Sequence, residues 1–224
     1  MRGVTMEKGL ASGSEDAYVS FDDLVNRIRT CTRCVLSSSR TQAVVGDGPL
    51  DSCVMLVGEA PGKEEDLRGL PFVGRSGQLL TEMLESVGLR RKEVYITNVV
   101  KCRPPGNRSP LDEEIRACLP HLVAQIGFIK PRVIVALGSV ASNALTSGVV
   151  RLTRDHGKWR KDYNLTDDKI DLFVTFHPSA ALRNPVWSRC MAEDFRLLKK
   201  GLDAFCDRVV PLSFWSNRGG GNVK

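Results

Sequence analysis

Four of the seven cysteines have the spacing expected of metal ligands. Cys31 and Cys34 form the motif CTRC, in which two intervening residues let one turn direct both sulfurs at a single centre. Cys102 and Cys118 follow, with fifteen residues between them. Thiolate ligands suit either tetrahedral zinc or an iron–sulfur cluster. Zinc ligands usually form two closely spaced pairs, so the long and unequal gaps here favour a cluster that connects an N-terminal helix to the core.

The chain has the features of a cytoplasmic protein, where clustered cysteines bind metal more often than they pair. It has no run of about 18 apolar residues that could span a membrane. The N-terminal stretch MRGVTMEKGLASGSEDAYVS has no apolar signal region. The three remaining cysteines lie in apolar contexts and are expected to be packing residues: Cys53, Cys190 and Cys206.

Strand and helix patterns alternate between these cysteines. Short, continuous apolar runs predict four buried strands, at residues 53–58, 93–100, 132–138 and 171–176. Helical spacing of apolar residues predicts five helices, at residues 21–31, 76–88, 109–130, 139–147 and 187–205. Ser109 is the expected cap of the third helix, and Pro120 is expected to kink or interrupt it.

This alternation predicts the α/β class: a three-layer αβα fold around a central, mostly parallel four-stranded sheet. We expect one domain at residues 21–207, between a flexible tail at 1–20 and a flexible basic tail at 208–224. In such folds the ligand site gathers at the carboxyl edge of the sheet. The segments that follow the four strands there are GEAPG, NVVKCRPPGN, LGSVAS and HPSAALRNP.

The charge balance favours a polyanionic partner. The formal net charge is +6 and the sequence pI is about 9.0. Basic side chains near phosphates release condensed counterions, which promotes binding to nucleic acid. The chain has neither a G-x-G-x-x-G motif after its first strand nor a P-loop, which argues against an enzyme that cradles nucleotide phosphates.

Four motifs in order, GEAPG, PFVGRSGQLL, TNVVKCRPPGNRSP and FHPSAALR, resemble the family 4 uracil-DNA glycosylases. This is the iron–sulfur-containing group of the uracil-DNA glycosylase superfamily, and the resemblance covers residues 21–206. It implies a monofunctional base excision repair enzyme that hydrolyses the N-glycosidic bond of uracil in DNA and leaves an abasic site. It also implies a structural [4Fe–4S] cluster at Cys31, Cys34, Cys102 and Cys118.

The resemblance assigns a uracil pocket to four residues. Phe72 would stack on the base, and Gly58 would let the backbone approach it closely. The Asn98 carboxamide can donate to uracil O4 and accept from N3–H, whereas cytosine would present mismatched groups. His177 would donate toward O2 and stabilise negative charge on the leaving base. The other histidines, His121 and His156, are taken as structural.

One position departs from the classical single-domain members. Ala60 stands where those enzymes carry an aspartate that is proposed to position the attacking water, and alanine cannot do this. Two carboxylates lie nearby in the sequence, Glu59 and Glu65. We hypothesise that one of them orients the water and opposes the developing positive charge on the sugar.

The resemblance also suggests how DNA is held. The loop 179–185, which begins at Ser179, would enter the minor groove, with Leu182 as its apolar wedge and Arg183 beside it for phosphate. Arg103 and Arg108 are further phosphate candidates because they lie between two of the cysteines. The basic stretch 151–163 either lies along the DNA backbone or forms a solvated hairpin face.

Two alternatives of other kinds are less favoured. A relative that bonds covalently to the abasic site carries a histidine-containing insertion after the GRSG motif, whereas this chain continues directly into a helix. A non-catalytic DNA-binding module would not need Asn98, His177 and an acidic first motif together. We expect a monomer, associated with the nucleoid, that binds uracil-containing DNA and could meet a replication or repair protein through a tail.

Overall fold

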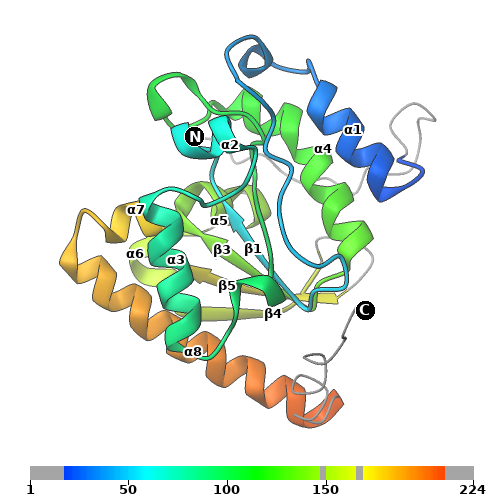
Figure 1. Cartoon of the computed structure of the whole chain (residues 1–224). Helices are drawn as coiled ribbons and strands as arrows, with labels where there is room; N and C mark the ends of the chain where they lie inside the picture. The colour runs from blue at the N-terminus through cyan, green and yellow to red at the C-terminus, as the bar shows by residue number, and fades with distance from the viewer. Residues whose placement is uncertain (1–17, 147–149, 165–168, 210–224) are drawn as a thin grey trace, which may run out of the picture.

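A five-stranded sheet forms the centre of the molecule, with helices on both faces (Figure 1). The computed structural model describes residues 18–146, 150–164 and 169–209. The strands are β1 (Val54–Gly58), β2 (Tyr95–Asn98), β3 (Val133–Leu137), β4 (Lys158–Asn164) and β5 (Lys169–Thr175). Their order is β2-β1-β3-β5-β4, and every neighbouring pair is parallel except β4 and β5. The mostly parallel α/β sandwich is therefore confirmed.

The fifth strand, β4, is the difference from the expected four-stranded sheet. Its sequence KWRKDYN is highly charged and lacks the apolar run of a buried strand. At the sheet edge this composition is acceptable, because one side of the strand has no neighbour and charged side chains there discourage further pairing. Trp159 packs against Phe173 of β5 with a ring centroid distance of 5.1 Å, while Lys158 remains exposed.

Two helical layers enclose the sheet because side chains alternate along each strand. Met55 and Val57 pack into a core with α1 (Phe21–Thr30), α4 (Asp112–Ile129) and α5 (Gly138–Thr146). Leu56 packs on the opposite face with α3 (Arg75–Ser86) and α8 (Pro185–Val209). The short elements are η1 (Val35–Ser38), α2 (Lys63–Arg68), η2 (Arg91–Glu93), η3 (Pro105–Asn107), α6 (Leu152–Asp155) and α7 (Pro178–Ala181).

The helix predictions hold in position, with two corrections in α4. This helix begins at Asp112 rather than at Ser109, because the Glu114 carboxylate accepts the Leu111 N–H at 2.8 Å and closes the first turn. The helix also continues through Pro120 to Ile129, so the interruption expected as one outcome at this proline does not occur. In the described ranges, no helix is long and apolar enough to cross a membrane.

The remaining predictions on the cysteines and the tails have mixed outcomes. Cys190 is partly buried and packs against the core, as expected. Cys53 is exposed, so its expected packing role is wrong; it precedes β1 instead of lying inside the strand. The Cys206 side chain and nearly all of both predicted tails lie outside the described residues.

Gly77 in α3 lets this helix press against the loop that precedes it. A Cβ atom at Gly77 would lie 1.8 Å from the Phe72 carbonyl oxygen, a distance that no side chain can adopt. A Cβ atom at Gly127 in α4 would meet no heavy atom within 4 Å. Glycine is thus required at position 77 because α3 lies close to the Phe72 carbonyl. At position 127 no such contact requires a glycine.

We predict that Gly77→Ala lowers the free energy of unfolding by about 1–3 kcal/mol, because the loop carrying Phe72 must move away. Gly127→Ala should instead raise it by about 0.5–1 kcal/mol, because alanine restricts the unfolded chain more than glycine does. Urea unfolding of the two variants measures both effects. Equal stability of the two variants would contradict the close contact.

Candidate active site

The ends of β1 and β2 bring three predicted pocket residues together. Gly58 and Asn98 are paired in the parallel register of these strands. A Cβ atom at Gly58 would lie 2.4 Å from Asn98 Oδ1 and 2.5 Å from Phe72 Cζ. The carboxamide and the ring therefore both contact the backbone of Gly58, and a larger residue there would displace them.

Phe72 is held in an unusual backbone conformation. Its φ angle is 50°, in the left-handed region that bulky residues avoid. Its ring is 6% exposed and lies 5.7 Å from the His177 ring, centroid to centroid. Strain of this kind persists only where the surroundings enforce it, and it occurs preferentially at functional sites.

Glu65 supplies part of that enforcement. Its carboxylate accepts the backbone N–H groups of Val73 and Gly74, each at 2.9 Å, and that of Gly62 at 3.1 Å. Arg91 adds a bond from Nη2 to the Pro71 carbonyl at 2.6 Å. Both Glu65 oxygens are thus engaged with backbone, which suits a residue that fixes the loop around Phe72.

His177 has a defined tautomer. Its Nδ1 accepts the Ser179 backbone N–H at 3.1 Å, so the proton of the neutral ring lies on Nε2. Burial, with a smaller contribution from Arg183, lowers the pKa of His177 to about 4, so the ring is neutral near pH 7. Gly138 makes room for it, because a Cβ atom there would lie 2.8 Å from His177 Cβ.

Two buried polar atoms in this pocket lack hydrogen-bond partners among the described residues. They are Asn98 Oδ1, an acceptor, and His177 Nε2, a donor. Leaving such an atom unpaired costs about 1–3 kcal/mol, so buried polar groups are usually satisfied. An acceptor and a donor beside an aromatic ring can bind a flat, polar heterocycle.

Glu59 is the second carboxylate of the hypothesis. It follows Gly58 directly and is partly buried. Burial raises its carboxyl pKa above the ordinary value, and a hydrogen bond with the Ser109 side chain partly offsets this increase. Unlike Glu65, it has no recorded bond to the backbone of the Phe72 loop.

The four predicted cysteine ligands line one cavity. Cys31 is the C-cap of α1 and Cys34 the N-cap of η1, so the CTRC motif occupies the turn between these helices. Cys102 follows β2, and Cys118 lies in α4. Within the described residues, no group of three or more His, Cys, Asp or Glu side chains already has the close arrangement of a bound metal site.

Two hydrogen-bond donors already point at these sulfurs. Arg40 Nη1 lies 3.1 Å from Cys102 Sγ, and the Lys101 backbone N–H lies 3.2 Å from Cys118 Sγ. Burial raises the pKa of the Cys118 thiol to about 12. The free thiol is therefore neutral, whereas a metal would require the thiolate form.

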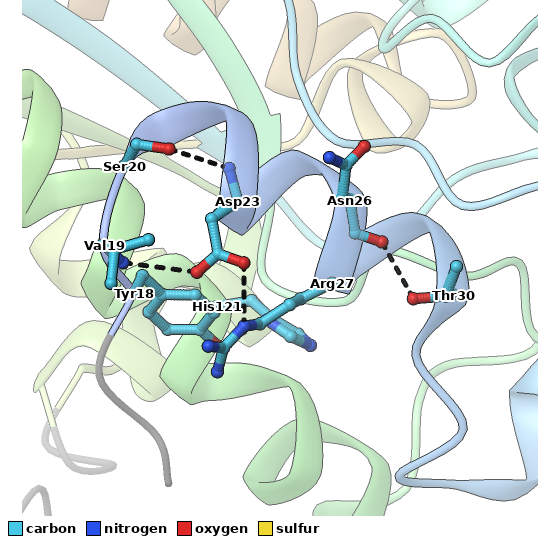
Figure 2. A network of polar contacts seen from close by, with 8 residues as sticks. All are labelled: Tyr18, Val19, Ser20, Asp23, Asn26, Arg27, Thr30 and His121. Atoms are coloured by element: carbon cyan, nitrogen blue, oxygen red, sulfur yellow. Dashed lines mark hydrogen bonds and ion pairs between the residues drawn. The ribbon is translucent and has the colours of Figure 1, made fainter. Parts of the chain in front are cut away.

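A polar network at the start of α1 reaches His121 of α4 through Tyr18 (Figure 2). Tyr18 Oη and His121 Nδ1 are 2.8 Å apart, and the Arg27 guanidinium lies 5.1 Å from the centre of the Tyr18 ring. Asp23 bonds Arg27 Nε at 3.1 Å. His121 also lines the cysteine cavity. The structural role expected for this histidine would therefore be at the wall of that cavity.

The predicted DNA-binding residues fall into two groups. Leu182 is 43% exposed, and Arg183 beside it is also exposed. Ser179 instead contacts His177, with its Oγ 2.8 Å from Nδ1. Immediately beyond, the sequence analysis missed two apolar residues that α8 presents to solvent: Val186 and Trp187.

The two arginines between the cysteines already have protein partners. Arg108 forms a bidentate pair with Glu114, with N–O distances of 2.8 and 2.6 Å. Arg103 Nε bonds Asn107 Oδ1 at 2.7 Å. These bonds order the loop between the two cysteines. The pair formed by Arg103 and Asn107 is exposed.

The fold and the pocket together define a class: a mostly parallel α/β protein with a pocket at the carboxyl edge of its sheet that can receive a flat, polar heterocycle. The family model described as the uracil DNA glycosylase superfamily matches residues 45–199. A type-4 uracil-DNA glycosylase of Pyrobaculum aerophilum is 46% identical over 184 residues, which cover 80% of this chain and 94% of that protein. One from Thermotoga maritima is 51% identical over 162 residues, which cover 70% and 81% respectively.

A third, from Archaeoglobus fulgidus, is 41% identical over 205 residues, which cover 87% of this chain and 98% of that protein. The chain belongs to the uracil-DNA glycosylase superfamily and, within it, to the type-4 family. The resemblance recognised in the sequence motifs is confirmed.

The pKa of His177 leads to a prediction about stability. The folded-state pKa, about 4, is below the ordinary value of 6.5, so the folded state binds the proton less well than the unfolded state. The resulting stabilisation is complete above pH 6.5 and disappears as the pH falls toward 4. From the shift we expect a loss of roughly 3 kcal/mol over this range.

The comparison variant is His177→Gln, which cannot titrate there. Urea unfolding at several pH values should show a steeper decrease for the wild-type protein than for the variant, since all other titrating groups are shared. Parallel curves for the two proteins would contradict a neutral, buried His177.

Proposed function

We propose that this protein is a monofunctional DNA repair glycosylase that releases uracil from DNA and leaves an abasic site. The observation that carries the proposal is a pair of buried atoms beside Phe72, Asn98 Oδ1 and His177 Nε2, which have no hydrogen-bond partner in the part of the chain that the structure describes. The names of the relatives support the same substrate. Because a stacked base cannot reach the sheet edge, uracil must be flipped out of the helix.

Asn98 selects uracil over cytosine. Its Oδ1 accepts from uracil N3–H and its amide N–H donates to O4. Cytosine has an acceptor at N3 and an amino group at C4, so both contacts would become mismatched. Each mismatch leaves a buried polar group unpaired, which costs about 1–3 kcal/mol.

His177 assists departure of the base. The neutral ring donates its Nε2 proton in a hydrogen bond to uracil O2, where negative charge develops as the glycosidic bond breaks. Ser179 N–H holds the ring in the required tautomer. A donor in a buried site stabilises the developing anion more than water would.

Of the two carboxylates, we assign water orientation to Glu59. Its side chain is partly buried next to Gly58, and its negative charge would oppose the positive charge that develops on the sugar. Glu65 keeps the loop at Phe72 in place through three backbone hydrogen bonds. The catalytic role considered for Glu65 is thereby replaced by a positioning role.

A [4Fe–4S] cluster held by Cys31, Cys34, Cys102 and Cys118 fits the cysteine cavity. The support is the convergence of four thiols on one cavity and the two N–H donors at 3.1 and 3.2 Å from their sulfurs. Such donors are typical of cluster environments. When bound, the cluster supplies a rigid cross-link between α1, the loop after β2 and α4, and hydrolysis requires no electron transfer.

DNA contacts complete the proposal. Leu182 fills the space left by the flipped nucleotide, and Arg183 and Arg103 bind phosphates. Arg108 contributes indirectly through its pair with Glu114. We further propose a monomeric, cytoplasmic, nucleoid-associated enzyme of one domain; any partner contact through its tails involves residues outside the described ranges.

The decisive experiment measures uracil release from a labelled duplex with a single uracil, without divalent metal, beside thymine and cytosine duplexes. Asn98→Ala and His177→Ala should each lower the single-turnover rate by about 100–1,000-fold, because each removes a contact to the reacting base. Asn143→Ala is the matched control, since Asn143 also has an unpartnered buried oxygen in the described structure but has no assigned contact with the base. Near-wild-type rates in a folded Asn98 or His177 variant would refute the role of that residue.

The cluster assignment makes a separate prediction. Cys118→Ala should purify with little iron, lack the visible absorbance of an iron–sulfur cluster and unfold at a lower temperature. Cys53→Ala, which changes an exposed cysteine outside the cavity, should keep iron and stability. Iron analysis and thermal unfolding measure both, and zinc in place of iron in the wild-type protein would contradict the cluster.

A further inference from the structure

Lys101 places a fully buried amine next to the proposed base pocket. The residue is 1% exposed and is among the largest fully buried side chains of the described residues. Burying an ammonium group is costly unless each of its protons has an acceptor. Its Nζ donates to Thr97 Oγ1 at 2.7 Å, to the Asn98 carbonyl at 2.7 Å and to Gln125 Oε1 at 2.5 Å. All three protons are therefore used.

The acceptors are themselves fixed. Gln125 Nε2 donates to the Val45 carbonyl at 2.8 Å and to Tyr95 Oη at 3.1 Å. Thr97 Oγ1 also lies 2.8 Å from the Val45 carbonyl. The network thus joins β2, α4 and the segment at Val45, and Lys101 connects it to the backbone of Asn98.

Asn98 depends on this connection because its own side chain is poorly anchored. The carboxamide oxygen has no hydrogen-bond partner among the described residues. Its direction is therefore set by packing against Gly58 and by the position of the Asn98 backbone. The backbone position is fixed on one side by the register with Gly58 and on the other by the bond from Lys101.

We propose that Lys101 is a positioning residue: held by Thr97 and Gln125, it bonds the Asn98 carbonyl and fixes the backbone there, so that the carboxamide meets the base in a productive orientation. The proposal rests on the proposed function, because it assigns Asn98 to uracil recognition. It explains why an amine with three hydrogen-bond acceptors is buried at a place where an apolar side chain could fill the same space. Lys101 itself does not contact the base.

The test compares Lys101→Met, which keeps the length of the side chain and removes its donors, with Tyr95→Phe. The second variant removes one bond from the far side of the same network and leaves all three bonds of Lys101. Lys101→Met should lower the single-turnover rate of uracil release by about tenfold to 100-fold, the range expected for a misplacement of about 1 Å. Tyr95→Phe should stay within about twofold of wild type.

Two further measurements separate positioning from general loss of structure. Inhibition by free uracil should weaken in Lys101→Met. The affinity of this variant for an abasic-site duplex, which reports the amount of folded protein, should stay within about twofold of wild type. Lys101→Gln, which retains a donor, should recover part of the rate. If Lys101→Met does not fold, Gln125→Met provides the test, because it removes one acceptor of Lys101. Its single-turnover rate of uracil release should fall by about threefold or more.

Each remaining outcome counts against one specific statement. Equal rates for folded Lys101→Met and Tyr95→Phe would overturn the positioning role, as would a normal rate in folded Gln125→Met. A parallel loss of abasic-site affinity and stability in Lys101→Met would mean that the residue is only structural. Absence of uracil release by the wild-type protein would overturn the proposed function instead.

Discussion

Burying a polar atom without a hydrogen-bond partner costs about 1–3 kcal/mol, and the pocket does this with an acceptor on Asn98 and a donor on His177. Such atoms would relax toward any available partner unless their surroundings prevented it. In this pocket, close packing and one hydrogen bond hold the two side chains in place. Gly58 and Gly138 let the side chains lie close to the backbone, and Ser179 holds the imidazole through its other nitrogen. A base with complementary groups that enters the pocket would recover this cost.

The segment between β2 and α4 contains residues that contribute both to the pocket and to the cysteine cavity. Asn98 ends the strand, Lys101 donates a hydrogen bond to its backbone carbonyl, and Cys102 and Cys118 line the cavity shared with the CTRC motif. A cluster at these cysteines would hold α1, this segment and α4 at fixed distances, although none of its atoms needs to approach the base. In this arrangement a metal centre can be essential for an enzyme without taking part in its chemistry.

The sequence predicts the sheet core well, because buried parallel strands are continuous apolar runs and the side chains that follow them must gather at one edge. Motifs at that edge were sufficient to select Asn98 and His177 as candidates, and the structure places both beside Phe72. The edge strand β4 was not counted in the predicted sheet, because its charged and aromatic residues indicated either a DNA contact or a solvated hairpin face; its antiparallel pairing with β5 agrees with the hairpin. The roles of Glu65 and Lys101 depend on backbone groups that only the folded chain brings near, and no local pattern could indicate them. The predicted cap at Ser109 failed for the same reason, since Glu114 closes the helix from the third position.

The most direct measurement of the central statement is a crystal structure of the protein with free uracil bound. The account predicts that uracil stacks on Phe72, with N3–H within hydrogen-bond distance of Asn98 Oδ1 and O2 within hydrogen-bond distance of His177 Nε2. Both atoms that lack partners in the described structure would then be satisfied by one ligand. Uracil bound elsewhere, or bound beside Phe72 while Asn98 turns to a protein partner, would contradict it.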